Sequence, residues 1–211
     1  MHTALPHPHH DTAMTPAEEA ALRRRGASTA LWLFIAVASV LFTLFFVAYA
    51  MRMDQAPDWA PIGMPWQLWL STALLAAGSG LMHLAGAAAQ AQQPQLTRLW
   101  LMGGGLAAAA FLGSQLWGWQ SLIDQRVMLG SNPASSFFYV LTALHGLHVL
   151  GGLVAWSIAA QALALPRAEL PGAAWRIRLC ARYWHFLLLL WGALFGVLAA
   201  LTPEIVRWIC G

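Results

Sequence analysis

The chain has 211 residues, of which 59% are hydrophobic and only 9% are charged. Soluble domains contain about 25% charged residues, so this composition is typical of an integral membrane protein. The net charge of +3 is small and is spread among the loops, which argues against a nucleic-acid-binding function.

The first part of the chain, residues 1–27, is polar, and we expect it to be a mobile tail with one or two helical turns before the membrane. Its histidines are of a type that binds metal weakly, but prolines interrupt them and no further ligands have the spacing of a closed site. We therefore predict no metal site here. The apolar run that follows is about 20 residues long, which predicts a permanent membrane anchor.

Five apolar segments make up the rest of the chain. They lie at about 29–51, 67–90, 98–122, 136–163 and 180–202. Each is long enough to cross a hydrocarbon core of about 30 Å as a helix. Because the connecting segments are short, residues 28–211 form one domain. We expect an all-α integral membrane bundle of five transmembrane helices.

Arginine is distributed unequally between the two sides of this bundle. Eight arginines fall on the side of the N-terminus and three on the other: Arg23, Arg24, Arg25, Arg98, Arg167, Arg176, Arg178 and Arg182 against Arg52, Arg126 and Arg207. Basic residues are enriched in cytoplasmic loops. We therefore expect a cytoplasmic N-terminus and a periplasmic C-terminus.

Small residues predict where the spans touch each other. Glycines at 103–105 with alanines at 107–109, and Gly151 with Ala155, have the spacing of closely packed transmembrane helices.

Few polar side chains occur inside the spans, and four of them are histidines. His83 lies in the second span, Gln115 in the third, His145 and His148 in the fourth, and His185 near the start of the fifth. Such groups are costly in hydrocarbon. His145 and His148 are three residues apart, so we expect them on one helix face, with Thr142 and Gly152, turned toward protein.

Three interpretations of these histidines are open. Two stacked haems are excluded because the pair is separated by only about 4.5 Å along the helix, but one haem between His148 and another helix remains an alternative. A metal centre or a catalytic site would need further ligands or a carboxylate, and the predicted spans contain neither aspartate nor glutamate. We favour neutral imidazoles that hydrogen-bond neighbouring helices.

The last two spans carry motifs rich in histidine and aromatic residues. They comprise Phe138, Tyr139, Thr142, the run His145-Gly146-Leu147-His148, Gly151, the run Tyr183-Trp184-His185-Phe186 and Trp191. In this order, they resemble subunit III of haem-copper terminal oxidases. Weaker similarity at 31–36 and 111–117 extends the resemblance over nearly all the chain after the tail.

The resemblance implies an accessory subunit, not catalytic alone, that binds no haem or copper of its own. It would dock on subunit I, with subunit II in the complex, in a bacterial plasma membrane, and it would hold phospholipid. The complex would reduce oxygen with electrons from cytochrome c or quinol and pump protons. The residues expected to join helices or order lipid are His145, His148, His185, Thr142, Tyr183, Trp184, Gln115 and His83.

Three positions depart from the family pattern. Ala38, Gly118 and Leu188 stand where many relatives have a carboxylate. These departures leave open an accessory subunit of a nitric oxide reductase, and a b-type cytochrome stays as the alternative from another class.

Overall fold

The computed structural model describes residues 14–210 except 56, 61 and 165–169, and this part of the chain is helical without strands. The helices are α1 (Pro16–Gln55), α2 (Gln67–Gln90), α3 (Pro94–Asp124), α4 (Pro133–Ala164), α5 (Leu170–Ala200) and α6 (Pro203–Cys210). Five of them, α1 to α5, are long and apolar enough to cross a membrane. The prediction of an all-α bundle with five transmembrane helices is confirmed.

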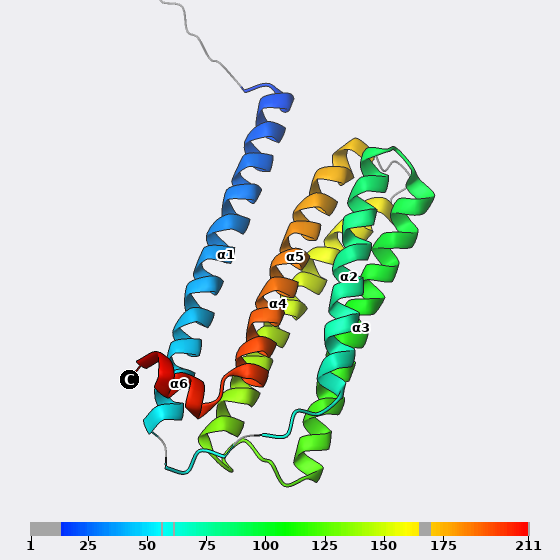
Figure 1. Ribbon diagram of the computed structural model, residues 1–211. Coiled ribbons are helices and arrows are strands. Elements are labelled where there is room, and N and C mark those ends of the chain that lie inside the picture. Colours follow the sequence, from blue (N-terminus) through cyan, green and yellow to red (C-terminus); the bar gives the residue numbers. More distant parts are fainter. Residues whose placement is uncertain (1–13, 56, 61, 165–169, 211) are drawn as a thin grey trace, which may run out of the picture.

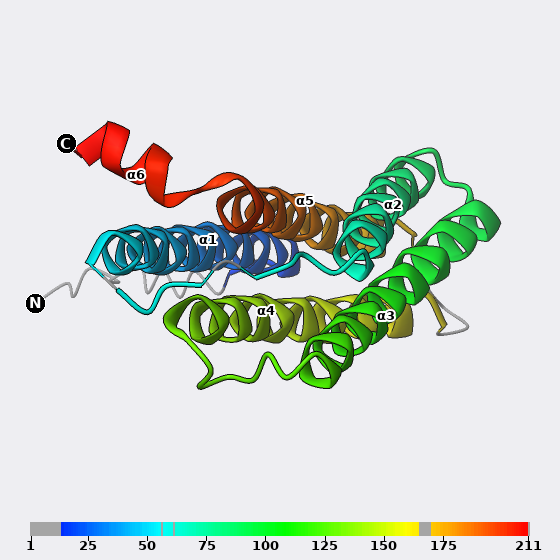
Figure 2. The same cartoon turned by 60° about the horizontal axis from the view of Figure 1, so that its bottom comes forward.

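The five long helices run side by side, with α1 at one edge, α2 and α3 at the other, and α4 and α5 between them (Figure 1). In the view of Figure 2, α1, α5 and α2 form one row, and α4 and α3 lie against it. Helix α4 packs on α5, α3 and α1, and α2 packs on α3 and α5. Thus α4 and α5 form the centre of the bundle.

Helix α1 begins well before its apolar segment. Thr15 and Glu18 form a reciprocal cap: the Thr15 amide donates to Glu18 Oε2 at 2.8 Å, and the Glu18 amide donates to Thr15 Oγ1 at 3.3 Å. Pro16 occupies the first helical position, which needs no amide hydrogen. Residues 16–27, which the sequence analysis assigned to the tail, are therefore the first turns of α1. Residues 1–13 of the predicted tail lie outside the described residues.

Helix α5 also begins earlier than predicted. It starts at Leu170, ten residues before the apolar segment, so Arg176 and Arg178 lie on a helix. Apolar length marks the hydrocarbon, whereas backbone hydrogen bonds continue a helix into the headgroup region. The short α6, which lies across the end of the bundle in Figure 1, is a further element that the sequence analysis did not include.

Glycines allow the close helix contacts that were predicted. Gly104 lies against the Met82 side chain of α2, and Gly105 lies against the indole ring of Trp156 on α4. The Trp156 indole N–H donates to the Leu101 carbonyl oxygen at 2.7 Å, which fixes the ring across α3.

The substitution Gly105→Ala should destabilise the bundle, because a Cβ atom there would overlap the indole ring of Trp156. We expect the free energy of unfolding to fall by about 1–3 kcal/mol, which is the usual cost of overpacking a core. Gly113→Ala is the matched control, since a Cβ at Gly113 meets no atom within 4 Å. Thermal unfolding in detergent, followed by circular dichroism, measures both. Equal midpoints for the two variants would contradict this packing.

Candidate functional site

His145 lies at the centre of the bundle with no exposed surface. Its imidazole packs against Phe111 of α3, with ring centres 5.7 Å apart, and against Trp191 of α5, at 5.1 Å. Neither ring nitrogen has a hydrogen-bond partner among the described residues. Since an unpaired buried charge is very costly, this environment holds the imidazole neutral.

His148 connects three helices. Its Nδ1–H donates to the Leu144 carbonyl oxygen at 2.7 Å within α4. Its ring lies between Phe34 and Phe42 of α1, with ring centres 5.6 and 5.5 Å away. From α5, the Tyr183 hydroxyl donates to the His148 carbonyl oxygen at 2.9 Å. This residue therefore joins α4 to both α1 and α5.

The predicted face of α4 divides between different neighbours. Thr142 accepts a hydrogen bond from the Trp119 indole of α3 at 3.1 Å, and Gly152 lies close to the Tyr183 and Trp184 rings of α5. The His145 ring meets α3 and α5, whereas the His148 ring meets α1. Residues three apart on a helix differ by about 60° in direction, and three helices surround α4, so neighbouring positions reach different partners. These residues lie against other helices of the bundle, but they do not form one cluster. The predicted hydrogen bonds from the imidazole rings to neighbouring helices are absent for both histidines of α4, because the His145 ring has no partner among the described residues and the His148 ring bonds its own helix.

His185 belongs to a separate cluster on α2 and α5. Its Nδ1 lies 2.6 Å from Ser79 Oγ, and its Nε2 lies 3.4 Å from His83 Nδ1. Both histidines are exposed on the outer side of the bundle.

Two predicted residues are buried without a hydrogen bond. The amide atoms of Gln115 and the indole Nε1 of Trp184 have no partner within the described part of the chain. Both side chains therefore contribute to the core by packing, and the structure gives no interhelical hydrogen bond for either.

The sequence analysis missed several polar contacts between helices. Ser71 of α2 and Ser114 of α3 lie 2.6 Å apart, and the Trp191 indole of α5 donates to Thr72 Oγ1 of α2 at 2.9 Å. The hydroxyls of Ser71 and Thr72 also donate to carbonyl oxygens of their own helix, so their presence in a span is a weak signal. Arg98 was counted only among the arginines of one side, but its guanidinium donates to the Leu163 carbonyl oxygen of α4 at 2.7 Å.

The polar and aromatic side chains described above connect the helices of the bundle to one another. Within residues 14–210, apart from the gaps at 56, 61 and 165–169, no three histidine, cysteine, aspartate or glutamate side chains lie close enough to hold a metal ion. The fold and these contacts define a class: a multi-pass membrane protein whose intramembrane polar groups connect its own helices.

Comparison with known proteins identifies the family, although no family model matches the chain. The chain is 31% identical over 180 residues to cytochrome c oxidase subunit 3 of Synechocystis sp., covering 77% of this chain and 70% of that protein. It is 29% identical over 171 residues to cytochrome bo(3) ubiquinol oxidase subunit 3 of Pseudomonas aeruginosa, covering 79% and 80%. A probable cytochrome c oxidase subunit 3 of Nocardia farcinica is 29% identical over 161 residues, covering 75% and 77%.

The chain belongs to the subunit 3 family of haem-copper oxidases. It is an accessory membrane subunit of such an oxidase, as the motifs of the last two spans predicted. Neither a nitric oxide reductase nor a b-type cytochrome is among these three relatives.

Tyrosine substitutions test the role of His148 as a connection between helices. Tyr183→Phe removes the hydrogen bond that α5 donates to α4. We expect the free energy of unfolding to fall by about 0.6 kcal/mol, and by at most about 1.7 kcal/mol, as for other interhelical hydrogen bonds in membranes. Tyr49→Phe is the control, because the Tyr49 hydroxyl makes no hydrogen bond to another described residue; its ring packs on Trp59 and Phe137. Denaturation in mixed micelles measures both variants. If the free energy of unfolding falls as much in Tyr49→Phe as in Tyr183→Phe, this role is contradicted.

Proposed function

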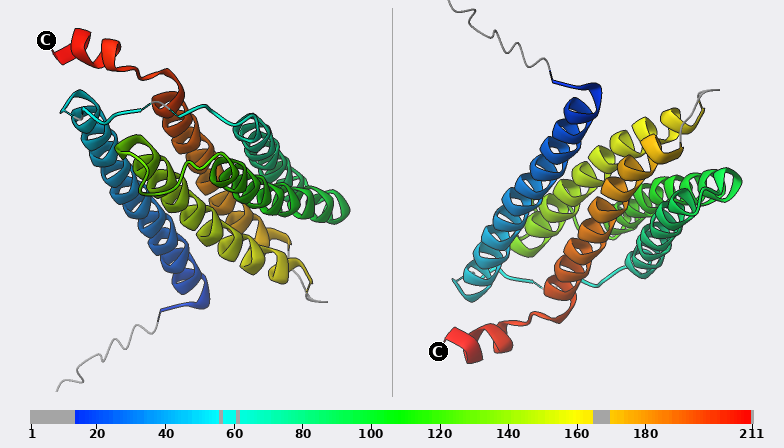
Figure 3. Two further views of the ribbon diagram at one scale, coloured as in Figure 1. Left: turned by 90° about the horizontal axis from the view of Figure 1, so that it is seen from below. Right: turned by 90° about the horizontal axis from the view of Figure 1, so that it is seen from above.

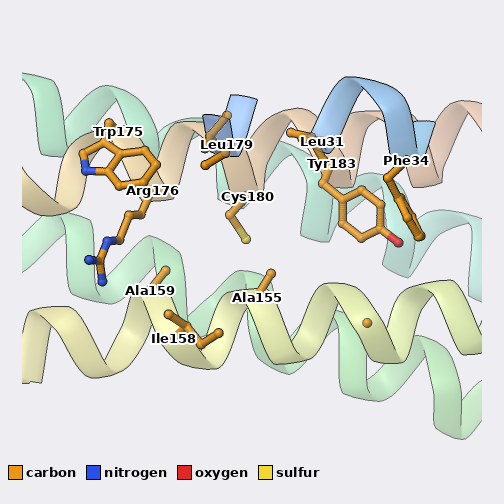
Figure 4. A pocket seen from close by; sticks show the side chains of 12 residues that line it. Leu31, Phe34, Ala155, Ile158, Ala159, Trp175, Arg176, Leu179, Cys180 and Tyr183 are labelled. Atoms are coloured by element: carbon orange, nitrogen blue, oxygen red, sulfur yellow. The ribbon is translucent and has the colours of Figure 1, made fainter. Parts of the chain in front are cut away.

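We propose that the chain stabilises the catalytic subunit of its oxidase and holds a phospholipid between α1, α4 and α5, without binding haem or copper itself. The observation that carries the lipid proposal is an apolar cleft between these three helices, shown in Figure 4.

The cleft has a volume of about 620 Å³, which is within the range of about 300–1,000 Å³ typical of small-molecule sites. Its walls are almost entirely apolar and come from Leu31 and Phe34 of α1, from Ala155 and Ile158 of α4, and from Leu179 and neighbouring residues of α5. An apolar wall of this kind, open to the membrane, suits an acyl chain.

One end of the cleft is basic. The exposed Arg176 lies beside Trp175, with its guanidinium carbon 5.6 Å from the indole centre. Among the described side chains, no carboxylate lies within 4 Å of Arg176. A lipid phosphate at this end would meet a positive charge, while the acyl chain would extend toward Tyr183, the residue that bonds His148.

Aromatic packing supports the proposal that no haem binds here. Phe111 and Trp191 lie against the His145 ring, and Phe34 and Phe42 lie against the His148 ring. Both ring nitrogens of His145 are enclosed, and among the described residues no histidine of another helix lies against either ring as a second axial ligand, which supports the absence of haem.

The orientation in the membrane is part of the proposal. The end at which α1 begins, hereafter the arginine-rich end, contains most of the arginines in the described residues. They are Arg23, Arg24, Arg25, Arg98, Arg176, Arg178 and Arg182. The enrichment of basic residues on the cytoplasmic side supports a cytoplasmic position for this end, in a bacterial plasma membrane, with subunits I and II as the partners.

Filling the cleft should remove the lipid. We expect Ala155→Phe to lower the phospholipid retained by the purified oxidase by about one molecule per complex, and Arg176→Gln to weaken retention of anionic lipid. Native mass spectrometry and phosphate analysis measure both effects.

The controls are Ala110→Phe, at an exposed alanine of α3, and Arg126→Gln, at the opposite end of the bundle. Lipid content that is unchanged in Ala155→Phe and Arg176→Gln, relative to these controls, would refute lipid binding in this cleft.

A further inference from the structure

We infer that the outer face of α2 and α5 is the docking surface for a transmembrane helix of the oxidase's catalytic subunit, and that this helix presents a carboxylate to His83. The inference rests on the proposed attachment to the catalytic subunit and adds to it the surface and the chemistry of the contact. In both views of Figure 3, α2 and α5 lie next to each other.

The imidazole pair of His83 and His185 is the first argument. His83 lies seven residues before the end of α2, which places it about 10 Å inside that end of the span. In the arrangement where Ser79 donates to His185 Nδ1, His185 Nε2–H donates to His83 Nδ1. His83 Nε2–H then points outward and has no partner among the described residues. Lipid acyl chains supply no hydrogen-bond acceptor, so leaving this N–H group unpaired inside the membrane costs free energy.

The exposed side of α5 is the second argument. Six exposed residues, here named the α5 stripe, follow one another at alternating intervals of four and three: Arg178, Arg182, His185, Leu189, Gly192 and Gly196. This spacing is that of a seam between two packed helices. A Cβ atom at Gly192 or Gly196 would meet no atom within 4 Å, so both glycines leave room for a neighbouring backbone.

Helix α2 continues this surface with small residues. Ala76 and Gly80 are exposed beside His83, and Gly80 likewise has open space at its Cβ position. Toward the opposite end of the bundle, Trp69 of α2 contacts Phe195 of α5, with ring centres 4.9 Å apart. The two helices therefore present small exposed residues beside one polar pair.

Charge defines the partner. The exposed Arg178 and Arg182 extend the α5 stripe toward the arginine-rich end, and in the described part of the chain neither has a carboxylate within 4 Å. Two cations and an outward imidazole donor on the same side are complementary to an acidic helix. A carboxylate near His83 would accept its hydrogen bond and lie within the field of both arginines.

Photo-crosslinking in the assembled oxidase tests the surface without disturbing the fold. A benzophenone side chain in place of Leu189, which is 71% exposed, should crosslink to the catalytic subunit, identified by mass spectrometry of its peptides. The same probe in place of Leu106 of α3, which is 73% exposed, should give no such product. Labelling of lipid alone, or of a second copy of this chain, from position 189 would overturn the inference.

Substitutions measure the strength of the contact. With Gly192→Leu or Gly80→Leu, recovery of this chain with the catalytic subunit should fall about tenfold, which corresponds to about 1.4 kcal/mol of association free energy. Gly113→Leu, at an open glycine of α3, should leave recovery unchanged. His83→Leu should weaken association, and His83→Gln, which keeps a donor, should restore part of it.

The outcomes separate this inference from the proposed function. If the unmodified chain does not purify with the catalytic subunit, the proposed attachment fails. If the unmodified chain purifies with it and Gly192→Leu and Gly80→Leu do so equally well, the attachment stands and this docking surface is refuted.

Discussion

The structure depends on one constraint: a polar side chain within the membrane has to lie against protein, because lipid tails offer it no hydrogen-bond partner. In this chain the constraint acts most strongly on α4, which carries Thr142, His145 and His148 among α1, α3 and α5. Thr142 accepts a hydrogen bond from the Trp119 indole. The His145 ring lies against Phe111 and Trp191, and the His148 ring lies against two phenylalanines of α1. The position of α4 is thus specified from three directions.

The same constraint organises the rest of the bundle. Lipid tails are as apolar as leucine, so burial alone does not favour helix association, and small residues with close packing replace it. Gly104 and Gly105 allow α3 to approach α2 and α4, and the Trp156 indole finds its acceptor on α3. Where polar or small residues remain exposed, as at His83 and Gly192, the constraint is not yet satisfied within this chain, and the surface is suited to another subunit.

More of the fold than of the candidate site could be predicted from the sequence. Apolar length located all five spans, but not the starts of α1 and α5, because helical hydrogen bonding continues past the hydrocarbon, as the Thr15 and Glu18 cap shows. The histidines of α4 were recognisable as protein-facing from their cost in lipid. Their partners were not, since spacing along one helix does not say which helices lie beside it. Thr72 and Ser114 were missed because a hydroxyl in a helix satisfies itself on its own backbone and so needs no neighbour.

The central claim is that the intramembrane histidines join helices and do not hold a cofactor. An absorption spectrum of this chain, purified alone from haem-replete cells, tests it most directly. The account predicts no Soret band, with helical content intact by circular dichroism. A stoichiometric Soret band that disappears in His148→Leu would contradict it, since it would make His148 an axial ligand.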